Sequence, residues 1–290
     1  MLNRYKKIYH CIPFNFSTFK FIMHSLVIYK DSLLAYQKSG QGKRALLLFH
    51  GFGQHHKVFE TLTETLSSSF TLYAFDLFFH GQSKWNQDEQ PLEKEMWREI
   101  MLQFLTENKV DHFSVLGFSL GGKFALASVE LFPDRIERVI LLAPDGIKTN
   151  FWYSLATYPL LLRRFFKSMI LKPGRLHAFT SLLHTLHVVD NGLLRFAESQ
   201  MDTQEKRERV YYSWVVFRHL KFEMKAIARI LETHSIRLTL VVGKHDKIIT
   251  TENMNHLLCH LKDYQFEVLD TGHNGVIAGS IPILGKINRI

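Results

Sequence analysis

Apolar residues occur along the chain in short continuous runs, and stretches with helical spacing of apolar positions separate these runs. The runs lack the polar alternation of a half-exposed strand, which is typical of strands buried on both faces of a parallel sheet. They occupy residues 45–51, 70–77, 112–119, 138–146, 237–246 and 265–270. Helical spacing occupies residues 58–69, 92–108, 121–131 and 251–261. The alternation predicts an α/β fold with a doubly wound, mostly parallel sheet and helices on both faces.

The first part of the pattern is different. Residues 24–30 and 32–40 both have strand character and are separated by Lys30-Asp31, so we expect a hairpin with its turn there. Pro91 precedes the helical pattern of 92–108, and we expect it in the first turn, where its missing N–H costs nothing.

Residues 147–225 interrupt the strand–helix alternation. They are rich in Leu, Phe, Tyr and Arg, have helical spacing, and lie between two expected strands of the sheet. This arrangement predicts a helical cap inserted into a core made of residues 23–146 and 226–290. The apolar residues of the cap either pack it onto the core or line a pocket beneath it.

The N-terminal 22 residues are basic at first and then aromatic, and polar residues and a proline interrupt their apolar run. They lack the continuous apolar core of a signal peptide. No stretch of about 18 apolar residues occurs in the chain, so we expect no transmembrane segment. Regular strand patterning begins only at Leu26, and we therefore expect Met23 to be the natural start and residues 1–22 to be an upstream reading. A short membrane-surface anchor is the alternative.

The composition is that of a globular protein. The 290 residues are 46% hydrophobic and 22% charged, which is enough for one large domain with a continuous core. The net charge of +9 indicates a basic surface, but no nucleic-acid-binding motif accompanies it, and we expect no nucleic-acid partner. Cys11 and Cys259 are isolated in sequence, which favours reduced thiols and a cytoplasmic location.

Polar side chains follow the apolar runs at the points where the strands are expected to end. The carboxyl ends of parallel strands meet at one edge of a sheet, and ligands bind there. We therefore expect one rim of the sheet to collect His50, Asp76, Ser119, Asp145, Asp246 and His273.

Ser119 has the sequence context of a nucleophile. It is the central residue of Gly-Phe-Ser-Leu-Gly at 117–121, between an expected strand and an expected helix. This strand–turn–helix pattern is a nucleophile elbow, in which Gly117 and Gly121 leave room for closely packed backbone. An ordinary glycine turn is the alternative, but the correct flanking elements favour the nucleophile.

A serine nucleophile needs a base, and the base needs an orienting carboxylate. We expect His273 to be the base because it follows the last strand, near the C-terminus, as the chain order Ser–Asp–His requires. The alternative is a surface histidine without a role. Asp246 is the favoured carboxylate because its strand comes later and its loop is near that of His273, whereas Asp145 is the rival.

The reaction also needs donors for an oxyanion. We expect them to be the backbone N–H of Leu120, which follows the nucleophile, and that of Phe52 in the loop 49–54. Gly51 and Gly53 allow this loop to turn, and a plain strand-ending turn is the alternative. Leu120 and Phe52 are therefore also the expected substrate-binding residues, with the Phe52 ring lining the acyl pocket.

Five motifs together resemble the α/β-hydrolase superfamily, in particular its capped group of small esterases and C–C bond hydrolases. They are HGFG at 50–53, DLFFHGQS at 76–83, GFSLGG at 117–122, GKHDKI at 243–248 and GH at 272–273. The resemblance runs from about Leu26 to the C-terminus. It implies Ser119 as nucleophile, Asp246 as orienting acid, His273 as base, Phe52 and Leu120 as oxyanion donors, and neither a metal nor a dissociable cofactor.

The chain departs from the family pattern in three loops, one of which is the loop after His273, where the usual proline is missing and a weak helical pattern follows. Phe78 and Phe79 stand where the family commonly has Pro-Gly, and Gln54 follows Gly53 where many C–C hydrolases have proline. Serine at 119 argues against the branches that use aspartate as the nucleophile.

The expected activity is hydrolysis of a carboxylic ester or thioester that carries a modest hydrophobic acyl group, through an acyl-enzyme. Basic residues of the cap segment either attract an anionic leaving moiety, such as a carrier-protein or coenzyme A thioester, or form a solvated helix face. C–C bond hydrolysis of a diketone with the same triad is the second hypothesis. A ligand-binding receptor on a hydrolase scaffold, with little turnover, is the third.

Overall fold

The computed structural model describes residues 25–148, 151–172, 174–175, 178, 181 and 201–287. The N-terminal segment 1–22, with its expected role, lies outside the described residues, as does Cys11. No helix among the described residues is long and apolar enough to cross a membrane.

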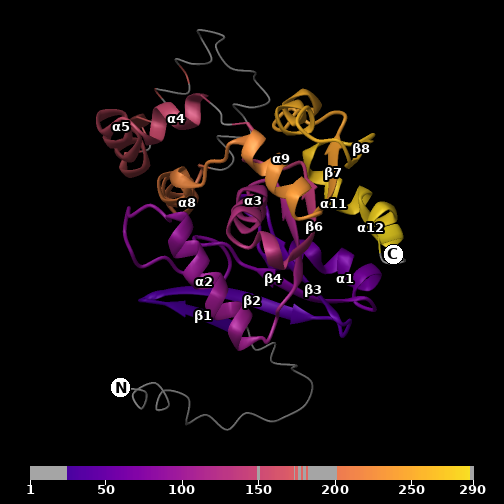
Figure 1. The fold of residues 1–290 in the computed structure, drawn as a ribbon. Coiled ribbons are helices and arrows are strands. Elements are labelled where there is room, and N and C mark those ends of the chain that lie inside the picture. Colours follow the sequence, from indigo (N-terminus) through magenta and orange to yellow (C-terminus); the bar gives the residue numbers. More distant parts are fainter. Residues whose placement is uncertain are drawn as a thin grey trace, which may run out of the picture.

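One eight-stranded sheet runs through the described part of the chain (Figure 1). Its strands are β1 (Ser25–Tyr29), β2 (Ser32–Ser39), β3 (Arg44–Phe49), β4 (Phe70–Phe75), β5 (Phe113–Phe118), β6 (Ile136–Leu142), β7 (Arg237–Gly243) and β8 (Gln265–Leu269). Their order is β1-β2-β4-β3-β5-β6-β7-β8. β2 is antiparallel to both β1 and β4, and the other neighbours are parallel. The mostly parallel sheet and the hairpin between β1 and β2 are confirmed.

Helices cover both faces of this sheet. One face carries α2 (Lys94–Glu107), α3 (Gly121–Leu131), α9 (Met224–Thr233) and α10 (Asn255–Leu258), and the other carries α1 (Glu60–Leu66), α11 (Val276–Gly279) and α12 (Ile281–Ile287). Short 3₁₀ turns η1 (His56–Phe59), η2 (Pro133–Arg135), η3 (Phe217–His219), η4 (Thr251–Met254) and η5 (His273–Gly275) complete the connections. The apolar runs explain this layering, because β5 is buried along its whole length and β3 along all but its first residue.

Two expected helices differ from the observed ones. The helix expected at 92–108 begins at Lys94, so the expectation that Pro91 lies in its first turn was wrong. The Leu92 N–H donates instead to the Val216 carbonyl at 2.8 Å, which ties this residue to the end of another helix. The pattern at 251–261 divides into η4 and the short helix α10.

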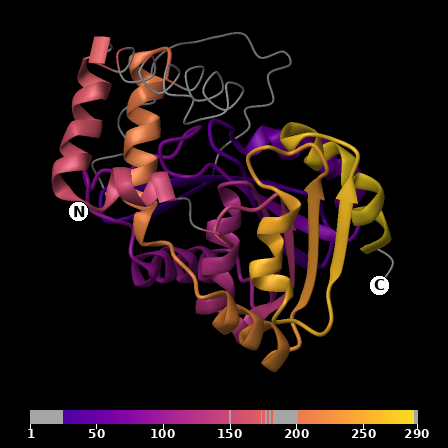
Figure 2. The same ribbon diagram turned by 90° about the horizontal axis from the view of Figure 1, so that it is seen from above.

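The described part of the segment expected to form a cap contains the helices α4 (Phe151–Thr157), α5 (Leu160–Leu171) and α8 (Gln204–Val216). α5 and α8 run side by side (Figure 2). Their facing sides form an apolar cluster of Phe166, Met169, Ile170, Val210, Tyr211 and Val215. The boundaries of the cap at 147 and 225 remain a prediction.

The turn between β5 and α3 is a tight junction in the core. Ser119 has φ of 50°, in the left-handed region that few residues other than glycine adopt. A Cβ on Gly117 would lie 2.5 Å from the Gly121 carbonyl oxygen, and one on Gly121 would lie 1.9 Å from that of Phe49. The expected role of these two glycines in letting backbone segments approach closely is confirmed.

We predict that Gly121→Ala destabilises the fold by about 2 kcal/mol or more, because the obstacle is backbone of the neighbouring strand β3 and cannot move aside. Urea unfolding of the variant beside the parent measures this change. Gly285→Ala in α12 is the matched control. Its new methyl group would lie 3.5 Å from the Thr65 side chain, which is an ordinary van der Waals contact. An unchanged unfolding free energy in Gly121→Ala would contradict the close approach.

Candidate active site

Ser119, His273 and Asp246 meet at the carboxyl edge of the sheet, each from a different connection. The His273 Nε2 lies 2.9 Å from the Ser119 Oγ, and the His273 Nδ1 lies 2.6 Å from the Asp246 Oδ2. The side chain of Asp246 is fully buried, and that of His273 is 12% exposed. The structure therefore brings together the three residues expected from their positions after strands.

The carboxylate of Asp246 is held in one orientation. Its Oδ1 accepts hydrogen bonds from the backbone N–H groups of Ile248 at 2.8 Å and Ile249 at 2.9 Å. Its Oδ2 is left for His273, and a carboxylate can only accept, so the imidazole Nδ1 donates. The Nε2 of the neutral ring is then free to accept the proton of the Ser119 hydroxyl.

Asp145, the rival carboxylate, has other partners. Its Oδ1 accepts from the Gly146 N–H at 2.7 Å, and its Oδ2 lies 3.5 Å from the Nζ of Lys123. Its backbone N–H donates to the Ser119 carbonyl at 2.8 Å and so braces the elbow. Lys123, only 4% exposed, was missed at the sequence level, although it is the single charged residue in the first two turns of α3.

The two expected oxyanion donors are available. Neither the Phe52 N–H nor the Leu120 N–H has a hydrogen-bond partner within the part of the chain that the structure describes. The loop that carries Phe52 is closed by Gln54, whose Oε1 accepts from the Gly51 N–H at 3.0 Å and whose N–H donates to the Gly51 carbonyl at 3.3 Å. Gln54, which stands where many C–C hydrolases have proline, therefore closes this loop.

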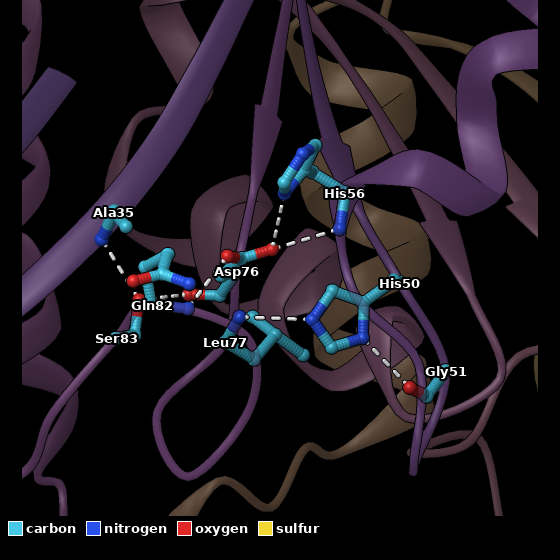
Figure 3. Close-up of polar contacts among 8 residues, drawn as sticks. All are labelled: Ala35, His50, Gly51, His56, Asp76, Leu77, Gln82 and Ser83. Atoms are coloured by element: carbon cyan, nitrogen blue, oxygen red, sulfur yellow. Dashed lines mark hydrogen bonds and ion pairs between the residues drawn. The ribbon is translucent and has the colours of Figure 1, made fainter. Parts of the chain in front are cut away.

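The loop after β3 is fastened to the loop after β4 by Asp76, a fully buried aspartate (Figure 3). Its Oδ1 accepts from both the backbone N–H and the Nδ1 of His56 at 2.8 Å, and its Oδ2 accepts from the Gln82 N–H at 2.8 Å. Burial alone would raise the pKa of Asp76, but these hydrogen bonds lower it to about 2. Asp76 is therefore ionised and holds the two loops together beside the candidate site.

His50 forms a second tie between the same loops (Figure 3). Its Nε2 accepts from the Leu77 N–H at 3.0 Å, so its Nδ1 carries the proton and donates to the Gly51 carbonyl at 2.7 Å. This neutral ring uses both nitrogens, and burial lowers the pKa of His50 to about 4. His50 and Asp76, both expected at the rim, support the loop that carries Phe52.

His80 packs against this support. Its ring meets those of His50 and Phe52 edge-on, with centroids 5.1 and 5.3 Å away, and its Nδ1 lies 2.9 Å from the Phe78 carbonyl oxygen. Burial, followed by the neighbouring His50, lowers the pKa of His80 to about 3. Its place within the family-like DLFFHGQS motif was the only signal for it in the sequence.

One group of potential metal ligands occurs among the described residues: His55, His56 and Asp76 have ligand atoms within 4.8 Å of one another. The carboxylate oxygens of Asp76 already accept three hydrogen bonds from protein N–H groups. These bonds account for the proximity of His56 and Asp76, and we assign no metal to the group.

Phe79 replaces a glycine of the family pattern at a position with unusual backbone geometry. Its φ is 69°, in the left-handed region. Its ring stacks on Tyr212 of α8 at a centroid distance of 5.8 Å and lies 5.9 Å from Phe217. Compared with the family glycine, Phe79 is less suited to this backbone conformation, but its ring gains an aromatic contact with the helical segment above the site.

A family model described as the alpha/beta hydrolase fold matches residues 44–280, which is more than half of the chain. The protein therefore belongs to the α/β-hydrolase family.

Individual relatives are distant. A pimeloyl-[acyl-carrier protein] methyl ester esterase of Nitrosomonas europaea is 30% identical over 98 residues, which are 34% of this chain and 36% of that protein. Among solved structures, a thermophilic esterase from Thermogutta terrifontis matches with a TM-score of 0.65 at 18% identity, over 92% of this chain and 96% of that one. A meta-cleavage product hydrolase from Pseudomonas fluorescens matches with a TM-score of 0.59 at 17% identity, over 91% and 94% of the two chains. At these identities the structural likeness shows the fold.

We predict that His80 makes the fold less stable in acid. The folded protein keeps His80 neutral down to about pH 3, whereas the unfolded chain protonates it near the ordinary value of 6.5. Between these two pH values, unfolding therefore takes up a proton at His80. The contribution of His80 to the free energy of unfolding is intact above pH 6.5 and falls by ~1.4 kcal/mol per pH unit as the pH drops toward 3. Urea unfolding between pH 7 and about pH 5 should show a shallower pH dependence in His80→Gln than in the parent.

The control for this measurement is His256→Gln, which removes an exposed histidine from α10 and should keep the parent slope. Equal slopes in His80→Gln and the parent would mean that the folded protein protonates His80 as readily as the unfolded chain does.

Proposed function

We propose that the protein is a serine hydrolase that cleaves a carboxylic ester or thioester through an acyl-enzyme. The observation that carries this proposal is the continuous chain from the Ser119 Oγ through His273 to the buried Asp246, with contacts of 2.9 and 2.6 Å. In this proposal Ser119 is the nucleophile, His273 the general base and Asp246 the residue that orients the imidazole.

In the first step the Ser119 Oγ attacks the carbonyl carbon while its proton passes to the His273 Nε2. The carbonyl electron pair moves onto oxygen, which forms a tetrahedral oxyanion. Collapse of this intermediate expels the alcohol or thiol, which takes the proton from His273. Water then repeats the sequence on the acyl-enzyme, releases the carboxylic acid and restores the Ser119 hydroxyl.

The proposed oxyanion donors are the N–H groups of Phe52 and Leu120, which have no competing partner in the described residues. Leu120 precedes α3, so the positive end of that helix dipole faces the same oxygen. Loss of one such donor typically costs about 10²- to 10³-fold in kcat. The two hydrogen-bonded ties through His50 and Asp76 support the geometry of the Phe52 loop.

The neighbourhood of Phe52 supports a hydrophobic acyl group. Phe52 packs against the apolar cluster between α5 and α8, and its ring lies beside His80. The positive charge of the cap segment is partly neutralised, because Lys167 and Arg163 approach Glu89 at 2.5 and 3.9 Å. An ester with a modest apolar acyl chain is therefore favoured over recognition that depends on a strongly anionic leaving group.

The cytoplasm remains the proposed location. Cys259 is a free, exposed thiol, which fits a reducing compartment.

We predict that p-nitrophenyl esters from acetate to palmitate are hydrolysed with an optimum at one acyl length, set by the depth of the apolar pocket. Ser119→Ala should lower kcat by ~10⁴- to 10⁶-fold because no other group can form the acyl-enzyme. Steady-state kinetics of both proteins measure this loss. Equal turnover in parent and variant would reject Ser119 as the nucleophile, and absence of turnover at every length would favour the C–C hydrolase or receptor hypotheses.

The two carboxylates give a matched pair of variants. Asp246→Asn should lower kcat by about 10⁴-fold, because the amide no longer stabilises the imidazolium and favours the wrong tautomer. Asp145→Asn should stay within about tenfold of the parent, because its side chain contacts Lys123 and Gly146 rather than His273. The reverse order of the two losses would transfer the orienting role to Asp145.

A further inference from the structure

A cavity of about 470 Å³ lies at the edge of the sheet where the parallel strands begin. Arg44 of β3, Ser114 of β5, Arg138 of β6 and Arg237 of β7 line it. Ser119 lies beyond the other end of β5, five residues from Ser114, which is about 16 Å along an extended strand. The cavity is therefore separate from the candidate active site.

The strand register gathers the arginines on one face of the sheet. Arg138 pairs with Ser114 on one side and with Arg237 on the other. Phe113 pairs with Ile136 and Ser114 with Arg138, so Glu137 is an extra residue in β6. Such a bulge re-aims the following side chain, and here it places Arg138 opposite Ser114 while Glu137 stays exposed.

Arg138 is buried in this cavity without a partner. Its side chain is 9% exposed, and it forms no ion pair or hydrogen bond with any residue that the structure describes. Within the same residues, Arg44 and Arg237 also have no ion pair, and the Arg44 guanidinium lies over the Phe70 ring at 4.3 Å from its centroid. Burial, followed by the charges of Arg237 and Arg44, lowers the pKa of Arg138.

Few acidic groups balance these three guanidinium groups. Glu137 and Asp134 are the acids that line the cavity, and the Asp134 Oδ1 already lies 3.0 Å from the Nδ1 of His234. Burial and repulsion by Arg237 and Arg44 both disfavour the charge of Arg138, although its guanidinium nitrogens still reach solvent. An anion in the cavity would remove both penalties.

We propose that this cavity binds the phosphate group of a small phosphate monoester, with Arg138 at its centre and Arg44 and Arg237 on either side. Guanidinium groups bind phosphate oxygens in a bidentate manner, and this geometry is stronger than a simple point-charge contact. Ser114 pairs with Arg138 and also lines the cavity, so its hydroxyl is a further donor there. A volume of about 470 Å³ is within the range of small-molecule sites and exceeds the need of a bare phosphate ion.

The concave arrangement favours a small ligand over nucleic acid. A nucleic-acid surface spreads its cations along a phosphate backbone, whereas these three arginines converge on one cavity. The ligand is also not the proposed acyl substrate, because the cavity lies at the opposite edge of the sheet from Ser119.

Isothermal titration calorimetry of the full chain tests the proposal with two probes, inorganic phosphate and phenyl phosphate, in chloride buffer of constant ionic strength at pH 8. We expect saturable one-to-one binding of at least one probe. Tighter binding of phosphate would assign the site to the free ion, and tighter binding of phenyl phosphate would assign it to the monoester. Arg138→Gln should weaken the binding by about ten- to hundredfold, because it removes a charge-assisted contact.

The matched control is Arg98→Gln, which removes the same charge from an exposed position on α2 and should bind as the parent does. Arg237→Gln, at the exposed start of β7, should also weaken binding and serves if Arg138→Gln does not fold. Absence of saturable binding in the parent, or equal weakening in Arg98→Gln and the cavity variants, would overturn the proposal.

Discussion

The close packing of backbone around the turn from β5 to α3 is the constraint on which the candidate site depends. Ser119 is held at φ of 50° by its own N–H, which donates to the Leu142 carbonyl at 3.0 Å, and by its carbonyl, which accepts from the Asp145 N–H at 2.8 Å. Both partners belong to β6 or the loop after it, so the neighbouring strand fixes the angle of the elbow. Strain of this kind persists only where the surroundings enforce it. The resulting position places the Ser119 Oγ within hydrogen-bond distance of His273.

The surroundings of the elbow combine one permanent negative charge with neutral histidines. Asp76 keeps its charge at low pH because three N–H groups point at it, whereas burial keeps His50 and His80 uncharged. His50 and Asp76 hold the loop of Phe52 through hydrogen bonds, and neither group changes its protonation near neutral pH. The groups that hold the loop are therefore different from His273, the residue that we propose to transfer the proton.

Much of the fold and the site could be predicted from the sequence, because parallel strands of a buried sheet are continuous apolar runs and the residues after them share one edge. Ser119, Asp246 and His273 each follow such a run. Contacts between residues far apart in the chain could not be predicted from the sequence pattern. The start of α2 at Lys94 depends on a bond from Leu92 to Val216, and the pairing of Lys123 with Asp145 depends on how α3 faces β6. Likewise, the alignment of Arg138 with Ser114 follows from a bulge that no local pattern indicates.

The two edges of the sheet carry different chemistry, with a proposed acyl-transfer site where the strands end and a proposed phosphate site where they begin. The central claim is that Ser119 is an activated nucleophile. Its most direct test is stoichiometric reaction with a fluorophosphonate, followed by intact mass and peptide mapping. The structure predicts one adduct per chain on the peptide that contains Ser119, and almost none in His273→Ala. An adduct on another residue, or no adduct in a protein that hydrolyses esters, would contradict the claim.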